Sequence, residues 1–324
     1  MMTPLLETEI KIKFIKDNFE RLLARNLDLT RVSAPLFVPR DSGLNDNLNG
    51  VERPVDFDIK QTGVIAEVVH SLAKWKRFAL YEYGFEPGKG LYTDMNAIRR
   101  DEICDELHSI YVDQWDWEKV ITRRQRNADY LRATVKSIYD ALKECSELLS
   151  EYYGERGCEL PSEVTFVTTQ ELEDRYPDLA PTERETAFVK ECGAMFLTQI
   201  GGRLKSGKKH DGRAPDYDDW ALNGDLVLYY PVLDRAFELS SMGIRVDRDS
   251  LIKQLETENA TDRLSLPFHK ALVDGTLPLT IGGGIGQSRL CMLLLGKRHI
   301  GEVQASIWPD DMRRECESKG IRLL

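Results

Sequence analysis

Residues 281–290 read IGGGIGQSRL, the sharpest local signal in the chain. Gly284, Gly286 and Arg289 form a GxGxxR pattern after an apolar run. Residues 290–295, which follow Arg289 in the sequence, predict an apolar helix. Glycines allow a ligand to approach the backbone closely, and the start of a helix favours anions. A dinucleotide fingerprint would need a third glycine where Arg289 stands. The pattern therefore favours a triphosphate or a planar base, and a simple tight turn is the alternative.

A second segment predicts a strand, a polar loop and a return strand. Residues 92–102 read YTDMNAIRRDE and residues 108–118 read HSIYVDQWDWE. Alternation in the return strand places Gln114 and Asp116 on one face and the tryptophans on the other. Polar side chains on one face of an apolar strand predict the floor of a ligand site. The alternative is that both are buried polar groups with structural partners.

Two acidic residues are candidate metal ligands. In residues 237–245, FELSSMGIR, alternation aligns Glu238 with Ser240, and Asp225 closes the preceding turn. Mg²⁺ is commonly held by one or two carboxylates together with substrate phosphates. Asp225 and Glu238 are therefore predicted to bind Mg²⁺, although either acid alone reads more simply as a surface charge.

The remaining periodicity predicts one α+β domain over residues 1–324. Apolar residues recur at helical spacing in residues 7–27 and 130–153, and residues 201–219 predict a surface loop. Expected strands cover residues 30–38, 57–71, 110–117, 164–168, 226–232 and 237–246. Because these strands do not alternate regularly with helices, the sheet is expected to be mostly antiparallel.

Composition excludes several classes of function. The net charge of -10 and the pI of about 5.2 disfavour a nucleic-acid partner. Six cysteines without a CxxC or Cys/His cluster argue against a zinc site and a disulfide framework. No signal peptide or apolar run of membrane length is visible, so we expect a cytoplasmic protein without a membrane partner.

Together these segments resemble the catalytic domain of class II aminoacyl-tRNA synthetases, whose fold is a mostly antiparallel β-sheet flanked by helices. Residues 14–35, 99–117 and 284–289 are similar to motifs one, two and three. The closer resemblance is to ammonia-dependent asparagine synthetases. It rests on DNLNG (46–50), VVHSLAKWKR (68–77), GLYTDM (90–95), YVDQWDWE (111–118), RAPDYDDW (213–220), LNGD (222–225), FELSSMGIRVD (237–247) and GGGIGQSRL (282–290). The longer polar loop of that family between DYDDW and LNGD is missing here.

The resemblance implies that ATP activates the β-carboxylate of aspartate as an adenylate, which ammonia converts to asparagine with release of AMP and pyrophosphate. It implies catalytic roles for Asp46, Arg99 and Arg289, with Asp46 near ammonia unless it is merely an Asx-turn residue. Implied aspartate-binding residues are Ser71, Lys76, Gln114, Asp116, Asp218 and Ser240. Implied ATP-binding residues are Arg99, Glu102, Asp225, Glu238, Gly284, Gly286 and Arg289, with Asp101 competing with Glu102 for the adenine side.

Two rival functions remain at this stage. An aspartyl- or asparaginyl-tRNA synthetase would share the fold, but only six residues precede the helix over residues 7–27, which leaves no room for an N-terminal anticodon-binding barrel. A non-catalytic descendant would predict eroded ATP motifs. We further expect a homodimer through residues 14–35, and ammonia rather than glutamine as nitrogen donor because no cysteine has a nucleophile setting. We interpret His70 as structural and the cluster at residues 205–210 as solvated surface charge.

Overall fold

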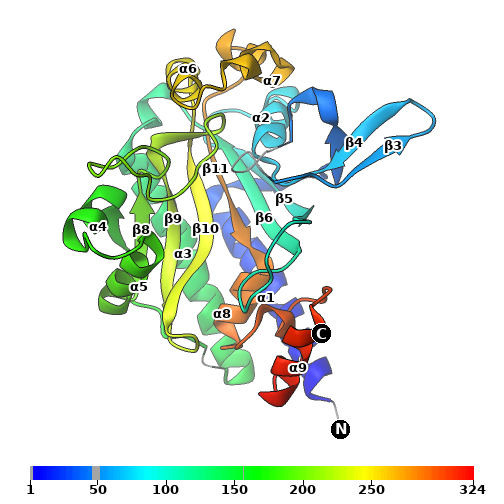
Figure 1. The fold of residues 1–324 in the computed structure, drawn as a ribbon, viewed down its shortest axis with the longest axis vertical. Coiled ribbons are helices and arrows are strands. Elements are labelled where there is room, and N and C mark those ends of the chain that lie inside the picture. The colour runs from blue at the N-terminus through cyan, green and yellow to red at the C-terminus, as the bar shows by residue number, and fades with distance from the viewer. Residues whose placement is uncertain (1–2, 46–51, 156) are drawn as a thin grey trace.

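The computed structural model describes residues 3–45, 52–155 and 157–324. Its centre is an eight-stranded sheet (Figure 1). In spatial order the strands are β1 (Leu29–Arg31), β5 (Gly90–Ile98), β6 (Tyr111–Val120), β11 (Thr280–Gly286), β10 (Arg235–Arg245), β9 (Asp218–Tyr230), β8 (Ala194–Thr198) and β7 (Thr165–Thr168). The pairs β1–β5 and β7–β8 at the two edges are parallel and the pairs between them are antiparallel. The predicted α+β class with a mostly antiparallel sheet is confirmed.

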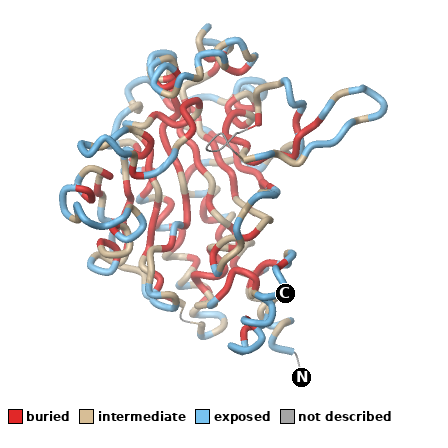
Figure 2. Tube along the Cα trace, in the orientation of Figure 1, coloured by how far each residue is buried: buried red, intermediate tan, exposed pale blue. Residues whose placement is uncertain are grey.

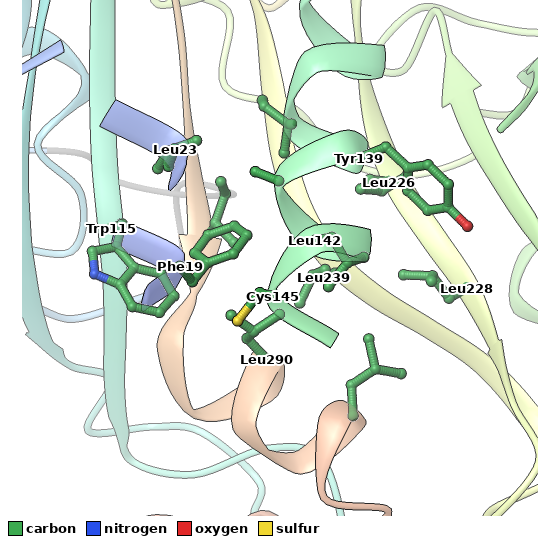
Figure 3. Packing of buried hydrophobic residues seen from close by; sticks show 14 of the residues in the cluster. Phe19, Leu23, Trp115, Tyr139, Leu142, Cys145, Leu226, Leu228, Leu239 and Leu290 are labelled. Carbon is green, nitrogen blue, oxygen red and sulfur yellow. The ribbon is translucent and has the colours of Figure 1, made fainter. Parts of the chain in front are cut away.

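Three helices cover one face of this sheet: α1 (Pro4–Leu27), α3 (Ala128–Tyr153) and α8 (Gln287–Leu294). Thr3 caps the start of α1 and Asn127 caps the start of α3, each accepting a backbone N–H with its side chain. Figure 3 shows Phe19 of α1 beside Trp115 of β6, and their ring centroids lie 4.9 Å apart. Leu142, Cys145 and Leu290 complete this part of the core. Both long predicted helices are therefore present, and they bury most of the apolar stripe that periodicity assigned to the core, except Ile10 of α1 and Tyr152 of α3, which are exposed.

The strand predicted over residues 57–71 is wrong in its extent. The chain instead forms the hairpin β3 (Asp56–Ile59) and β4 (Val64–Val68), turning at Gly63 with φ +67°. With β2 (Phe37–Pro39), this hairpin makes a separate three-stranded sheet that projects from the body (Figure 1). The strand predicted over residues 30–38 is likewise split between the two sheets, because β1 and β2 flank Pro35.

The other helices surround the large sheet: α2 (Ala73–Glu82), α4 (Thr169–Arg175), α5 (Pro181–Cys192), α6 (Arg248–Thr257), α7 (Pro267–Val273) and α9 (Asp310–Ser318). Single 3₁₀ turns are η1 (Arg40–Ser42), η2 (Arg123–Gln125), η3 (Thr261–Ser265) and η4 (Ile300–Glu302). Figure 2 shows that burial follows the sheet and its covering helices, whereas the β3–β4 hairpin is largely exposed. Among the described residues, no helix is long and apolar enough to cross a membrane.

Candidate functional site

A polar cavity of about 480 Å³ lies on the face of the sheet opposite α1 and α3. Gln114 and Asp116 line it, while Trp115 and Trp117 from the same strand pack into the core, as alternation predicted. A smaller cavity of about 150 Å³ adjoins it and shares Gln114. We call the first the large cavity and the second the small cavity.

The structure brings most of the predicted site residues together. The large cavity is lined by Ser71, Arg99, Glu102, Gln114, Asp116, Asp218, Asp225, Glu238 and Gly284. The small cavity adds Ser240, Gly286 and Arg289. Lys76 lines neither cavity, and Asp46 lies outside the described residues.

The glycines of β11 make room for side chains of β6. Gly284 is the register partner of Asp116, and Gly282 that of Glu118. A Cβ added at Gly284 would overlap the amide group of Gln114, and one added at Gly282 would overlap the carboxylate of Glu118. These glycines therefore let polar side chains of β6 lie across β11. The sequence had predicted only that the glycines let a ligand approach the backbone.

Behind the large cavity lies a chain of buried ion pairs. Lys76 is fully buried, and its ammonium group contacts Asp116 and the Gly283 carbonyl, two groups of residues that line the cavity. Burial lowers the pKa of Lys76 despite the opposing charge of Asp116. The Arg245 guanidinium pairs with Glu118 at 2.8 Å and with Asp218 at 2.5 Å. Burial alone would raise the pKa of Glu118, but Arg245 and Lys76 hold it below its usual value.

Arg213 forms an ion pair with Asp225, one of the two acids that were predicted to bind Mg²⁺. It donates to Asp225 at 2.6 Å and also to the hydroxyl group of Ser241. Burial, reinforced by Glu238, raises the pKa of Asp225 to about 7 although Arg213 opposes this. Among the described residues no group of three or more histidines, cysteines or acids could hold a metal ion. Two carboxylate donors nevertheless fit Mg²⁺, which keeps several water and phosphate ligands.

The expected alternation along β10 fails beside this pair of acids. The pairing with β9 shifts between Glu238 and Ser240, as in a β-bulge. Ser241 consequently joins Glu238 at the large cavity, while Ser240 lines only the small cavity. The Ser240 hydroxyl is buried there without a protein hydrogen-bond partner.

The small cavity contains the motif-two and motif-three side chains. Arg99 lies 3.7 Å from Glu102 in the loop between β5 and β6. The neighbouring Asp101 pairs with Arg53 at 2.5 Å and lines only the large cavity. Arg289 stands in the first turn of α8 and donates to the Glu238 carbonyl at 2.7 Å. Of the two competing acids, Glu102 is therefore the one that lines the same cavity as Arg289.

Asp113 fixes the start of α8. Its carboxylate accepts the Ser288 N–H at 3.0 Å and the Ser288 hydroxyl at 2.8 Å. Lys16 of α1 pairs with the same carboxylate at 2.9 Å. Asp113 therefore joins the three motif segments, because α1, β6 and α8 meet at one side chain.

Several site residues were missed from the sequence. Arg213, Ser241 and Arg245 line the large cavity, and Glu118 holds Arg245. A usable signal existed for one of them, because Arg245 is a charge that directly follows the uncharged residues 242–244 at the end of β10. His70 had been interpreted as structural and the cluster at residues 205–210 as solvated. His70 does line the large cavity, whereas Lys205 and Lys209 form ion pairs with Asp174 and Glu258.

Residues 222–225 continue the strand after Trp220, so β9 runs without the longer loop. Its first residues are anchored to α6, where the Gln254 side chain accepts the Trp220 N–H at 2.9 Å. Asp218 and Asp225 lie on this one strand, and both line the large cavity.

Comparisons with known proteins agree with this geometry. Residues 6–320 match the family model of aspartate–ammonia ligase. The chain is 62% identical over 321 residues to an aspartate–ammonia ligase of Clostridium perfringens, covering 99% of this chain and 96% of that protein. It is 63% identical over 318 residues to that of Ruminiclostridium cellulolyticum, covering 98% and 95%.

Solved structures with a similar fold are class II aminoacyl-tRNA synthetases. The asparaginyl-tRNA synthetase of Pyrococcus horikoshii, complexed with asparaginyl-adenylate, has a TM-score of 0.64 at 14% identity and covers 95% of this chain and 74% of that chain. That of Entamoeba histolytica, also with asparaginyl-adenylate, has a TM-score of 0.63 at 13% identity and covers 93% and 66%. At such identity the likeness concerns the fold.

Proposed function

Because the chain belongs to the aspartate–ammonia ligase family, we propose that it uses ATP to activate the β-carboxylate of aspartate as an adenylate. Ammonia then attacks the acyl carbon, and asparagine and AMP are released after pyrophosphate. A free carboxylate resists this attack because its oxygen is a poor leaving group. The phosphate ester of an adenylate leaves readily.

The observation that carries the proposal is the continuity of the two cavities. The large cavity offers Asp116 and Asp218 to an amino group, and Arg245 to a carboxylate. The small cavity offers Arg289 to a nucleotide. Arg99 lines both cavities, so its guanidinium would stabilise charge where an α-phosphate and a carboxylate meet.

Magnesium is part of the proposal. Asp225 and Glu238 would hold Mg²⁺ against the phosphates, where it would neutralise their charge. The ion pair between Arg213 and Asp225 supports a ligand-dependent exchange of partners. If Asp225 held the cation, the guanidinium of Arg213, which pairs with Asp225 here, would be available to an anionic substrate group.

The nitrogen source is proposed to be ammonia, with Asp46 accepting a proton from ammonium. Glutamine hydrolysis would need an activated nucleophile such as a cysteine thiolate. Burial raises the pKa of Cys158 to about 11 and that of Cys145 to about 12, so both remain protonated thiols near neutral pH. Such thiols also fit the reducing cytoplasm, where we place the reaction.

We further propose a homodimer whose interface includes residues 14–35. Exposed apolar side chains flank this segment at Ile10, Leu36 and Phe37. Closed twofold symmetry is the commonest arrangement of soluble oligomers. Sedimentation at micromolar concentration should give the mass of a dimer, and a monomer would contradict the interface.

An isotope experiment tests the activation step. Aspartate labelled with ¹⁸O in the β-carboxylate is converted to asparagine with ATP and ammonium chloride. An adenylate transfers one labelled oxygen to AMP, because the bond between the acyl carbon and that oxygen breaks when ammonia attacks. Label in inorganic phosphate together with ADP would show an acyl phosphate and overturn the proposal.

A further inference from the structure

The carboxylate of Asp216 lies outside both cavities, yet it is among the most completely buried charges of the described chain. Its Oδ2 atom is 2.9 Å from Lys74, 3.0 Å from Arg263 and 3.0 Å from His269. Burial alone would raise the pKa of Asp216, but Lys74 and the other two partners hold it far below its usual value. The carboxylate is therefore ionised and held by several segments at once.

Lys74 connects this carboxylate to the floor of the large cavity. It is 5% exposed and stands in the first turn of α2, three positions after Ser71, which lines the cavity. The Lys74 ammonium also donates to the backbone carbonyl of Asn45 at 3.2 Å. The Lys74 side chain thus links α2 to Asn45 and to Asp216.

Asp216 in turn belongs to the irregular segment 211–217, which precedes β9. The segment carries Arg213 and Tyr217 into the large cavity. Its backbone accepts hydrogen bonds from Gln254 at the Pro215 carbonyl and from Val246 at the Tyr217 carbonyl, each 2.9 Å long. It contains no helix or strand that could fix Arg213. The side chain of Asp216 therefore adds an anchor to these two backbone hydrogen bonds.

We propose that Lys74 and Asp216 are positioning residues, which hold the segment 211–217 against the start of α2 and so preform the aspartate-binding half of the site. This assignment of the substrate rests on the proposed function. Neither residue touches the cavity, so each acts through the residues it places. A misplacement of about 1 Å can cost about 100-fold in rate when reacting groups must be aligned.

A purely structural role makes a different prediction. Arg263 and His269 bind the same oxygen of Asp216, but they come from η3 and α7, which line neither cavity. If the three cations around Asp216 served stability alone, removal of any one of them would lower the melting temperature without changing KM for aspartate. If Lys74 positions the site, only its removal should change the recognition of aspartate. Arg263→Met is therefore the matched control for Lys74→Met, since both remove a cation and keep an unbranched side chain.

The experiment compares these two variants in the full chain. Lys74→Met should raise KM for aspartate at least about tenfold while KM for ATP changes less than about twofold. Hydrogen exchange in peptides covering residues 211–217 should become faster. Arg263→Met should lower the melting temperature but leave both KM values and this exchange close to wild type. Wild-type KM and exchange in folded Lys74→Met would overturn the proposal, and so would equal changes in the two variants.

Asp216→Glu decides the matter if Lys74→Met does not fold. It keeps the charge but displaces the carboxylate by one methylene, so it should raise KM for aspartate with a small change in melting temperature. An unchanged KM and unchanged exchange would count against positioning. Hydrogen exchange also separates the two ideas. A wild-type protein inactive on aspartate would contradict the proposed function, while the difference in exchange between Lys74→Met and Arg263→Met would still test the anchor.

Discussion

The large and the small cavity hold their charges in different ways. Around the large cavity, Arg245 is 4% exposed in its side chain and pairs with two carboxylates, and Lys76 is fully buried. Around the small cavity, the Arg99 side chain is 30% exposed and its nearest carboxylate is 3.7 Å away. Buried, fully paired charges cannot move without a large loss of free energy, whereas exposed charges can. The paired charges behind the large cavity are therefore fixed in place, whereas Arg99, which lines both cavities, can adjust to a bound ligand.

The largest effect on stability is expected from removing a buried charge beside the large cavity. Arg245→Met removes the shared partner of Glu118 and Asp218 and leaves both carboxylates buried. Loss of one partner of a buried ion pair typically costs about 3–5 kcal/mol. We expect a decrease of this size in the free energy of unfolding measured by urea denaturation. A decrease below about 1 kcal/mol, the range of surface pairs, would show that the two halves do not differ in this way.

A change at the partly exposed Arg99 should affect catalysis without affecting stability. Arg99→Lys keeps the positive charge but loses the planar fork that can bind two oxygens at once. Aspartate-dependent pyrophosphate formation should fall at least about tenfold, whereas the free energy of unfolding should change by less than about 0.5 kcal/mol. Turnover close to wild type would remove Arg99 from the reacting centre.

A substitution at Asp113 tests whether ligand binding in the small cavity depends on the hydrogen bonds that hold the start of α8. Asp113→Asn keeps one acceptor for Ser288 but loses the ion pair with Lys16. A weakened hydrogen bond of about 1 kcal/mol predicts an increase of about fivefold in KM for ATP, because Arg289 follows Ser288 on α8. KM for aspartate should remain within about twofold, and a parallel rise of both constants would contradict the division into halves.

The sequence predicted what depends on local periodicity. Alternation assigned Gln114 to the cavity and Trp115 to the core correctly, because β6 pairs with β11 without a register shift. The same rule failed after Glu238, because the shift there depends on the pairing with β9 and cannot be read from one strand.

Long-range ion pairs could not be predicted either. Arg245 and Glu118 are 127 positions apart, and Lys76 and Asp116 are 40 positions apart. Each charge is visible in the sequence, but its partner is fixed only by the tertiary fold. The family resemblance implied that Lys76 binds aspartate, but only the fold shows that its ammonium group pairs with Asp116. Arg245, the cation that does line the cavity, was overlooked.

The smallest effect is expected from His299, which supports the small cavity from behind. It precedes Ile300, which lines that cavity, and its Nδ1 accepts the Gly301 N–H at 3.0 Å. Burial lowers the pKa of His299 although Glu106 and Glu302 oppose this. Just below the usual histidine pKa of about 6.5, the unfolded chain therefore binds more protons than the folded protein, and stability falls as the pH falls through this window.

His299→Gln provides a matched control, because its amide oxygen can still accept the Gly301 N–H but does not titrate. The free energy of unfolding should be measured by urea denaturation between pH 5.5 and 7.5 in both proteins. The wild type should lose more stability than the variant on acidification, and the two curves should run parallel above pH 7. Carboxylates such as Glu118, whose pKa is depressed, stay ionised throughout this range, so they add the same constant contribution to both proteins. Equal slopes at acidic pH would mean that His299 is protonated as easily in the folded protein as in the unfolded chain. In that case the support behind the small cavity would be open to water, and the contrast between the two cavities would extend to the residues that hold them.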